Sequence, residues 1–362
     1  MSLAKITLQN FRNHESSALT ETAHFNLLVG ENGAGKTNVL EALSLLSPGR
    51  GLRRAALPQL ARHSGENEPA TGFAIGASLI EQGQVSARIG TYTEADRPNR
   101  RLVRINGAEA SATSLSEWHA VSWLTPTMDG LFTDSAGARR RFVDRMTLAV
   151  EPGHAKSVSQ YETALRERNR LLEERGDARW LDAIEAQAAQ HGSAVCAARA
   201  RLIAMLADEL SALPPEPFAR PALTYRAGGP TDAADLLASF ARERRRDAAA
   251  GRALTGPHRD ELEVVMASTG VPAASCSTGE QKAMLIAITL AQGVLASEGR
   301  PSVLLLDEVA AHLDPVRRAE LFRRLRGGKA QIWMTGTELA PFSEIKEEAA
   351  IWRVSGGTLS RI

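Results

Sequence analysis

Hydrophobic and polar positions alternate near the start of the chain, a pattern that is typical of strands. The alternation covers residues 3–8 and returns at residues 25–29, directly before a glycine-rich loop. From Thr37 the hydrophobic spacing changes to three and four residues, which predicts a helix. The inner face of this helix consists of Val39, Leu40, Leu43 and Leu46. The pattern therefore predicts a strand, a glycine loop and a helix in that order.

Two further patterns predict how the chain continues. Val85–Tyr92 and Arg101–Ile105 are typical of short strands, and Asn106-Gly107 is a favourable hairpin turn. Between about residues 135 and 213 the spacing becomes helical, with a break near Gly176-Asp177. The resulting pair of helices fits either a coiled-coil arm or a helical hairpin packed in a compact lobe. Because about 30 residues of helix span only about 45 Å, the compact lobe is favoured.

Composition limits the classes of function. The chain has 362 residues and a net charge of +1, so a DNA-binding protein of this kind would need a local basic patch. Its two cysteines, Cys196 and Cys276, form no closely spaced pair, which indicates a reducing compartment and no structural zinc. No segment has the length of a membrane span, so we expect a soluble protein of the cytoplasm, without a membrane partner.

The glycine loop has the residues of a phosphate-binding loop. Its glycines would let backbone N–H groups wrap a phosphate, and the positive end of the following helix would face the same anion. Lys36 would reach the β- and γ-phosphates, and the Thr37 hydroxyl would bind Mg²⁺. A glycine-rich surface turn is the alternative, disfavoured by the strand before the loop and the helix after it. The predicted ATP-binding residues here are Gly30, Glu31, Asn32, Gly33, Ala34, Gly35, Lys36, Thr37 and Asn38.

A second segment predicts the metal and the chemistry. The apolar run Val303–Leu306 is typical of a buried parallel strand, and it ends in Asp307-Glu308. Asp307 at the strand end would hold Mg²⁺, and Glu308 would act as the general base toward an attacking water. The alternative is a solvated strand end, although a buried strand rarely ends in two carboxylates without a cation or a reacting group.

A third segment, Ser277-Thr-Gly-Glu-Gln281, precedes an apolar helix. By itself it would be explained as a helix start with Ser277 as the N-cap. Together with the other two segments it resembles the signature loop of the ABC ATPases through Ser277, Gly279 and Gln281. In that superfamily the loop of one subunit closes on the γ-phosphate held by the other. Glu280 and Cys276 depart from the superfamily's pattern of glycine and leucine.

Further motifs make the chain similar to the RecF family, the bacterial recombination-mediator ATPases related to Rad50 and the SMC proteins. Lys36 and Asp307 lie further apart than a compact transporter ATPase needs, and closer than in long-armed chromosome-maintenance proteins. The motifs that carry the resemblance are Asn10-Phe-Arg-Asn13, Leu40-Glu-Ala-Leu43, Gly49-Arg50 followed by Arg53-Arg54, Leu124-Thr-Pro126, Ala138–Asp144 and, most specific of all, Thr255-Gly-Pro-His-Arg-Asp260.

The resemblance implies further site residues. Arg12 would lie at the nucleotide phosphates with Asn13 near them, and Asp314 matches the loop that crosses a dimer interface. Transporter ATPases have a histidine after the next strand, whereas this chain has Thr335-Gly-Thr337 there. A threonine must serve in its place, or the contact is absent. The chain also has no assignable glutamine for the loop that senses magnesium.

Three groups of arginines are candidates for DNA contact, because the planar arginine fork suits phosphate. They are Arg139–Arg141, Arg244–Arg246, and Arg50 with Arg53 and Arg54. For Arg244–Arg246 a solvated helix face paired with Glu243 and Asp247 is favoured. Arg139–Arg141 fit DNA contact and an interface between lobes equally well.

The sequence thus predicts an α/β protein with an ABC-type P-loop ATPase lobe, a mixed sheet with flanking helices, built from residues 1–134 and 251–362. A mainly helical lobe, 135–250, is inserted between them. We expect ATP and Mg²⁺ to drive formation of a homodimer that clamps duplex DNA, with slow hydrolysis to reset it. The resemblance implies a place at the nucleoid, recognition of gapped DNA with a single-stranded part, loading of RecA, and RecR and RecO as partners. The alternatives are a transporter's ATP-hydrolysing subunit and a structural DNA clamp without relevant turnover.

Overall fold

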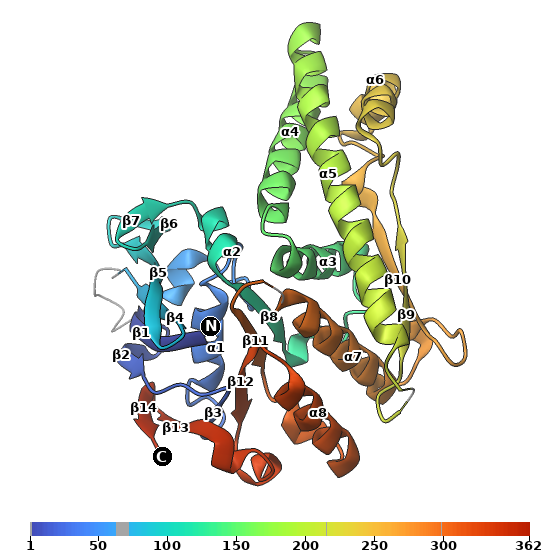
Figure 1. Ribbon diagram of the computed structural model, residues 1–362. Helices are drawn as coiled ribbons and strands as arrows, with labels where there is room; N and C mark the ends of the chain where they lie inside the picture. The colour runs from blue at the N-terminus through green and yellow to red at the C-terminus, as the bar shows by residue number, and fades with distance from the viewer. Residues whose placement is uncertain (1, 63–71, 215, 298) are drawn as a thin grey trace. The chain divides into compact units, whose positions relative to one another are not determined.

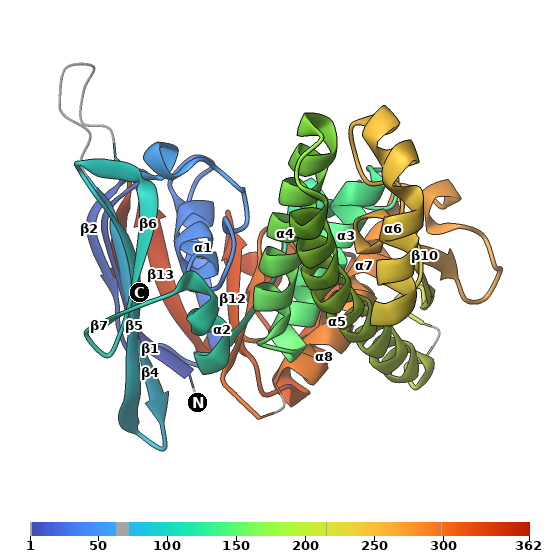
Figure 2. The same cartoon turned by 90° about the horizontal axis from the view of Figure 1, so that it is seen from above.

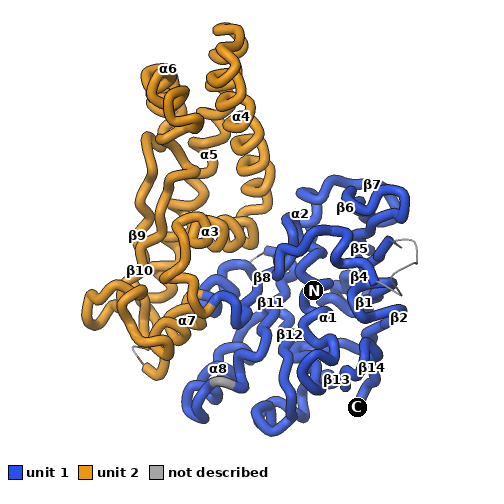
Figure 3. The backbone as a smooth tube through the Cα atoms, turned by 180° about the vertical axis from the view of Figure 1, so that it is seen from behind, with its two compact units in different colours: residues 1–128, 289–362 blue, residues 129–288 orange. Residues whose placement is uncertain are grey.

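The computed structural model describes residues 2–62, 72–214, 216–297 and 299–362. The chain forms two compact units (Figure 3). One, which we call the split unit, consists of residues 1–128 and 289–362, and the other, the inserted unit, consists of residues 129–288.

The bounds of these units differ from the predicted division at residues 129–134 and, over a longer stretch, at residues 251–288. The prediction assigned this segment to the ATPase lobe, whereas it groups with the inserted unit. The reason is a strand pairing that the periodicity does not reveal. β10 (Glu261–Met266) pairs in antiparallel fashion with β9 (Pro221–Arg226), which joins the segment to the insertion before it.

The split unit contains a six-stranded, mainly parallel sheet in the order β14-β13-β3-β12-β11-β8 (Figure 1). Every residue of its strands β3, β8 and β11 is buried, as expected for parallel strands that are covered on both faces. Only the edge strand β14 runs antiparallel, to β13. The strands are β3 (Phe25–Val29), β8 (Ala120–Leu124), β11 (Ser302–Leu306), β12 (Gln331–Gly336), β13 (Ala349–Ser355) and β14 (Thr358–Arg361).

A second sheet of the split unit is antiparallel, in the order β2-β1-β4-β5-β6-β7. Asn106 and Gly107 both have positive φ angles, 52° and 86°, and form the predicted hairpin turn between β6 and β7. The strands are β1 (Ser2–Phe11), β2 (His14–Leu19), β4 (Ala74–Glu81), β5 (Gln84–Glu94), β6 (Arg97–Ile105) and β7 (Ala108–Ala110).

The core of the split unit joins both sheets to the helix α1 (Lys36–Ser44), which Figure 2 shows beside them. Leu8 of β1, Leu43 of α1 and Trp333 of β12 are members of one buried cluster. The remaining helices of this unit are α2 (Leu115–Trp118), α8 (Pro315–Gly327) and the end of α7 (Thr278–Ala296). The predicted mixed α/β fold is therefore confirmed.

The inserted unit is mainly helical, as predicted. Its helices α4 and α5 form the hairpin, and the break between them is set by Arg175 in a left-handed conformation and by Asp177, whose side chain caps α5. Tyr161, Ala188 and Phe240 from three different helices share one buried cluster, so the hairpin packs within a compact unit. The helices are α3 (Ala136–Val150), α4 (His154–Glu174), α5 (Ala178–Ser211) and α6 (Ala233–Ala250).

Short 3-10 segments connect these elements. They are η1 (Leu57–Leu60), η2 (Ala112–Ser114), η3 (Pro126–Met128), η4 (Pro257–Arg259), η5 (Ala273–Ser275), η6 (Ala310–His312), η7 (Ala340–Phe342) and η8 (Lys346–Glu348). Among the described residues, no helix is long and apolar enough to cross a membrane.

Candidate nucleotide-binding site

The glycine loop lies between β3 and α1, and its backbone requires glycine at two points. A Cβ atom on Gly30 would lie 2.2 Å from the carbonyl oxygen of Val354, on the neighbouring strand β13. Gly35 has a φ of 114° and serves as the N-cap of α1, where a Cβ would lie 2.7 Å from the side chain of Asn13. The loop therefore packs closely against its surroundings and presents the first N–H groups of α1 at its end, which suits an anion.

Lys36 is held inside this loop. Its Nζ donates hydrogen bonds to the carbonyl oxygens of Gly30 at 2.7 Å and Glu31 at 2.9 Å. Burial lowers the pKa of Lys36, and the nearby carboxylates of Glu308 and Asp307 partly offset that effect. The ammonium group is thus placed at the loop by the protein itself, next to two carboxylates.

The parallel pairing of β11 with β12 brings Asp307, which directly follows β11, close to Thr335 of β12. Thr37 Oγ1 donates to Asp307 Oδ1 at 3.0 Å, and Thr335 Oγ1 donates to the same oxygen at 2.7 Å. The backbone N–H of Glu308 in turn donates to Thr335 Oγ1 at 2.9 Å. Burial raises the pKa of Asp307, while the hydrogen bonds from Thr335 and Thr37 lower it. Thr335 therefore contacts Asp307 at the end of β11. It belongs to the segment that stands where transporter ATPases have a histidine.

These residues fit a magnesium ion. Thr37 Oγ1 and Asp307 Oδ1 lie 3.0 Å apart. Hydroxyl and carboxylate oxygens are hard ligands of the type that Mg²⁺ prefers. Glu308, the predicted general base, follows directly and has a φ of 54°, in the left-handed region that a non-glycine residue adopts only when its surroundings enforce it.

A buried carboxylate organises the side of the loop near β1. Glu41 of α1 is fully buried, and the guanidinium of Arg12 binds it through two hydrogen bonds of 2.9 Å, from Nε to Oε2 and from Nη2 to Oε1. Arg12 Nη1 also donates to the carbonyl oxygen of Gln59 at 2.9 Å. Arg53 Nη1 reaches the same Glu41 oxygen, Oε2, at 3.1 Å. Both arginines therefore meet at one carboxylate.

From this carboxylate a chain of hydrogen bonds continues to the glycine loop. Arg53 Nη1 donates to Asn38 Oδ1 at 2.6 Å, and Asn38 Nδ2 donates to Asn13 Oδ1 at 2.7 Å. Asn13 Nδ2 then donates to the carbonyl oxygen of Ala34 at 3.0 Å. A cavity of about 640 Å³ borders this hydrogen-bond network. It is lined by Arg12, Asn13, Asn38, Arg53, Gln59, Ala61, Arg62 and Gly356.

Glu41, Arg53 and Gln59 were missed as site residues by the sequence reasoning. Glu41 was named only as part of a family motif, and Arg53 only as part of such a motif and as a candidate for DNA contact. The available signal was a carboxylate between Leu40 and Ala42, inside a run of hydrophobic helix positions, because a buried carboxylate needs a charged partner.

The signature-like segment belongs to the inserted unit, whereas the glycine loop belongs to the split unit. Ser277 precedes α7, and Glu280 Oε2 accepts hydrogen bonds from the Ser277 backbone N–H and from its hydroxyl, both at 2.8 Å. Gln281 Nε2 donates to the carbonyl oxygen of Cys276 at 2.9 Å. Glu280 and Ser277 thus form a capping box, which explains the acidic residue as part of the helix start. A Cβ on Gly279 would meet nothing within 4 Å.

Asp314 is likewise used at a helix start. Its side chain caps α8 by accepting a hydrogen bond from the backbone N–H of Arg317 at 2.9 Å. This places Asp314 at the N-terminus of a helix that begins with Pro315, while half of its side chain remains exposed.

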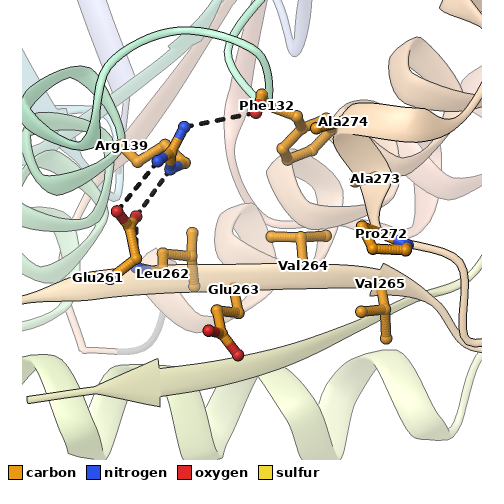
Figure 4. Close-up of a pocket in the computed structure, with 10 residues that line it drawn as sticks. All are labelled: Phe132, Arg139, Glu261, Leu262, Glu263, Val264, Val265, Pro272, Ala273 and Ala274. Atoms are coloured by element: carbon orange, nitrogen blue, oxygen red, sulfur yellow. Dashed lines mark hydrogen bonds and ion pairs between the residues drawn. The ribbon is translucent and has the colours of Figure 1, made fainter.

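Some of the candidate arginines for DNA contact pair with carboxylates of their own unit: Arg53, Arg139, Arg244 and Arg246. Arg139 makes a bidentate pair with Glu261 beside Phe132, along a cavity of about 420 Å³ (Figure 4). This pairing raises the pKa of Arg139. Arg140 donates to the carbonyl oxygen of Asp260. Arg244 binds Glu185 and Asp182 in place of the expected Glu243 and Asp247, whereas Arg246 pairs with Glu243.

The chain is similar to known proteins over nearly its whole length. The family model described as "RecF/RecN/SMC N terminal domain" matches residues 2–358. A curated relative, "DNA replication and repair protein RecF" of Brucella suis biovar 1 (strain 1330), is 47% identical, and the match covers 100% of this chain and 97% of the relative. The protein of the same description from Mesorhizobium japonicum (strain LMG 29417 / CECT 9101 / MAFF 303099) is 45% identical, with 99% and 97% covered. The chain belongs to the RecF family.

Solved structures agree with the RecF family fold. A chain described as the recombination mediator protein RecF-ATPrS in the RecFOR pathway matches with a TM-score of 0.85 at 21% identity, covering 99% of this chain and 98% of that one. An Smc head domain derived from Pyrococcus furiosus matches with a TM-score of 0.55 at 15% identity, covering 100% and 96%. The predicted family is confirmed, with its link to DNA replication and repair, and the transporter alternative receives no support.

Proposed function

We propose that the chain binds ATP with Mg²⁺ at the glycine loop and hydrolyses it slowly. The observation that carries this proposal is the convergence of Thr37 and Thr335 on one oxygen of Asp307, next to Lys36. Solved relatives of the same fold, described as RecF-ATP and RecF-ATPrS, support it. Bound at Thr37 and Asp307, Mg²⁺ would neutralise charge on the phosphates.

Each residue of the candidate site has a distinct role in this proposal. Lys36 exchanges its bonds to the carbonyls of Gly30 and Glu31 for the β- and γ-phosphate oxygens. The glycine loop and the N-terminus of α1 donate backbone N–H groups to the phosphates. Glu308 accepts the proton of the attacking water, and Thr335 holds the Glu308 backbone in place. Arg12, Asn13 and Asn38 bind the nucleotide from the neighbouring cavity.

ATP then serves as part of a dimer interface. Ser277, Gly279 and Gln281 of one copy close on the γ-phosphate held by a second copy, with Asp314 at the same interface. The closed dimer clamps duplex or gapped DNA, the DNA weakly stimulates hydrolysis, and hydrolysis resets the clamp. RecR and RecO are the partners, and RecA is the recombinase that is loaded. The RecFOR pathway named for a solved relative supports this set of partners.

The test is ATP-dependent dimerisation, measured by light scattering with and without a gapped duplex. We expect Glu308→Gln to bind ATP and to accumulate as a dimer, with turnover lowered by at least about a hundredfold. Glu347→Gln removes an exposed carboxylate of η8 and serves as the control. Normal turnover of Glu308→Gln would remove Glu308 as the base. Ser277→Arg is expected to bind ATP as a monomer, and undiminished dimerisation of that variant would remove Ser277 from the interface.

A further inference from the structure

Glu41 is an ionisable side chain in an apolar place. It lies on α1 among Leu40, Ala42 and Leu43, all members of the main buried cluster, and its own side chain is 0% exposed. An ionised carboxylate in such a place requires charged partners, and Arg12 and Arg53 supply them. Glu41 itself has no surface through which it could touch a ligand, so any effect on a ligand must pass through its partners.

Arg12 is fixed on three sides yet keeps unused donors. A guanidinium carries five N–H groups, and three of them are engaged, two by Glu41 and one by the carbonyl oxygen of Gln59. Its backbone has a φ of 54°, so the residue is held by its surroundings in a conformation that a non-glycine residue rarely adopts. Arg12 lines the 640 Å³ cavity, and two of its five guanidinium N–H groups are not used by Glu41 or Gln59.

Arg53 couples the same carboxylate to the glycine loop. It shares Oε2 of Glu41 with Arg12, and it begins the hydrogen-bonded chain through Asn38 and Asn13 to the carbonyl oxygen of Ala34. Both arginines line the cavity, and its walls contain no carboxylate among their described residues. Within the part of the chain that the structure describes, Glu41 is the carboxylate that both arginines contact.

We propose that Glu41 is a positioning residue for the nucleotide: it holds Arg12 and Arg53 at the cavity beside the glycine loop, so that their free N–H groups meet an anionic ligand without reorganisation. This inference rests on the proposed binding of ATP at the loop. It assigns to Glu41 an effect on nucleotide affinity that is exerted entirely through the two arginines. Preorganised donors bind more tightly than donors that must first be ordered.

The test is a double-mutant cycle on ATP affinity, measured by fluorescence titration with a labelled ATP analogue. Glu41→Gln and Arg12→Gln are each expected to weaken binding by about tenfold, the range of one charged hydrogen bond. If Glu41 acts through Arg12, the double variant is no weaker than the weaker-binding single variant. Multiplying effects would overturn the proposal, as would unchanged affinity in Glu41→Gln.

The chain offers a matched control in Glu185 of the inserted unit. This carboxylate is also 0% exposed and is also shared by two arginines, Arg168 and Arg244. Glu185→Gln is expected to lower stability while leaving ATP affinity unchanged. An equal loss of ATP affinity in Glu185→Gln would mean that general destabilisation explains both variants, and the proposal would fail.

A second cycle keeps the proposal testable if Glu41→Gln does not fold. Arg12→Gln and Arg53→Gln leave Glu41 in place, and because both arginines share its Oε2, their effects on ATP affinity are expected to be non-additive. Independent effects would overturn the shared positioning. Wild-type protein that fails to bind ATP at all would instead refute the proposed function, and the two failures are therefore distinguishable.

Discussion

The two units of the chain contain the same charge arrangement in different surroundings. In each, one fully buried glutamate is shared by two arginines: Glu41 by Arg12 and Arg53, and Glu185 by Arg168 and Arg244. Arg12 keeps 22% of its side chain exposed and borders a cavity, whereas Arg168 is completely buried. We call Arg12 and Arg168 the inner arginines, and Arg53 and Arg244 the outer ones. Both clusters contain the same kinds of ions, so the surroundings of the inner arginine distinguish a candidate site from a structural element.

The enclosed arginine has partners on every side. Arg168 donates to Glu185 at 2.9 Å, to Asp247 at 2.7 Å and to the carbonyl oxygen of Phe240 at 2.8 Å. Its guanidinium also lies 4.9 Å from the centre of the Phe240 ring. These contacts join α4, α5 and α6, so the Glu185 cluster stabilises the helical packing and leaves no room for a ligand.

The largest expected effect is on this enclosed cluster. Arg168→Met should cost about 3–5 kcal/mol of stability, because it leaves the buried Asp247 and Glu185 without their shared partner. Hydrogen exchange of the amides in α4, α5 and α6 would measure the loss unit by unit. ATP affinity should be unchanged, and a matching loss of nucleotide binding would break the distinction between the two clusters.

Asp307 sharpens the comparison, because its buried carboxylate accepts hydrogen bonds from the hydroxyls of Thr37 and Thr335 instead of from guanidinium groups. Thr335→Val removes one of them and should cost about 1–2 kcal/mol. It should also raise the pKa of Asp307 further, since the hydrogen bond from Thr335 lowers it. Comparison of wild type and variant by chemical denaturation gives the first effect. Unaltered stability would show that Thr335 contributes nothing to holding Asp307.

The same carboxylate predicts a pH dependence. Because burial raises the pKa of Asp307 in the folded protein, folding is disfavoured by its ionisation above that pKa and gains stability as pH falls through it. Magnesium binding depends on pH in the opposite direction: it weakens as pH falls, because the metal binds the ionised carboxylate. Mg²⁺-dependent ATP affinity should therefore fall on mild acidification before the protein unfolds, and at higher pH in Thr335→Val. A loss of affinity that follows unfolding would contradict this assignment.

The smallest effects concern the two outer arginines. Arg53 and Arg244 are both partly exposed, so Arg53→Gln and Arg244→Gln should each change stability by no more than about 1 kcal/mol. Only Arg53→Gln should alter ATP affinity. Thermal unfolding and nucleotide titration of the two variants would show whether Arg53 affects ATP affinity and Arg244 does not, as expected for Arg12 and Arg168.

Local patterns in the sequence were sufficient for much of the fold. Alternation before the glycine loop, helical spacing after Thr37 and the turn at Asn106-Gly107 depend on neighbours in the chain, and the structure contains the corresponding elements. The division between the units was predicted wrongly at residues 251–288, since it depends on the pairing of β10 with β9, which no local pattern records.

The candidate site shows the same limit. The motifs predicted Lys36, Thr37 and Asp307 together, because their spacing and order indicate one phosphate site. Glu41 and Arg53 were missed as neighbours of this site, because Arg12 and Arg53 meet at Glu41 only in the folded chain. The sequence left Arg139 open between DNA contact and an interface between lobes, and it did not reveal the partner Glu261, which lies far along the chain. Charge clusters in a sequence show the cations but do not show which carboxylates fold onto them.

The split unit has a consequence for synthesis. Its central sheet takes β3 and β8 from the first part of the chain and β11, β12 and β13 from the last. On a ribosome the glycine loop emerges early, yet Asp307 and Thr335 follow only after the whole inserted unit has been made. The inserted unit has its own buried cluster and can gain order first. A nascent chain therefore cannot assemble the proposed magnesium site until translation has passed β12, so nucleotide binding must wait for the synthesis of the inserted unit and of the strands β11 and β12.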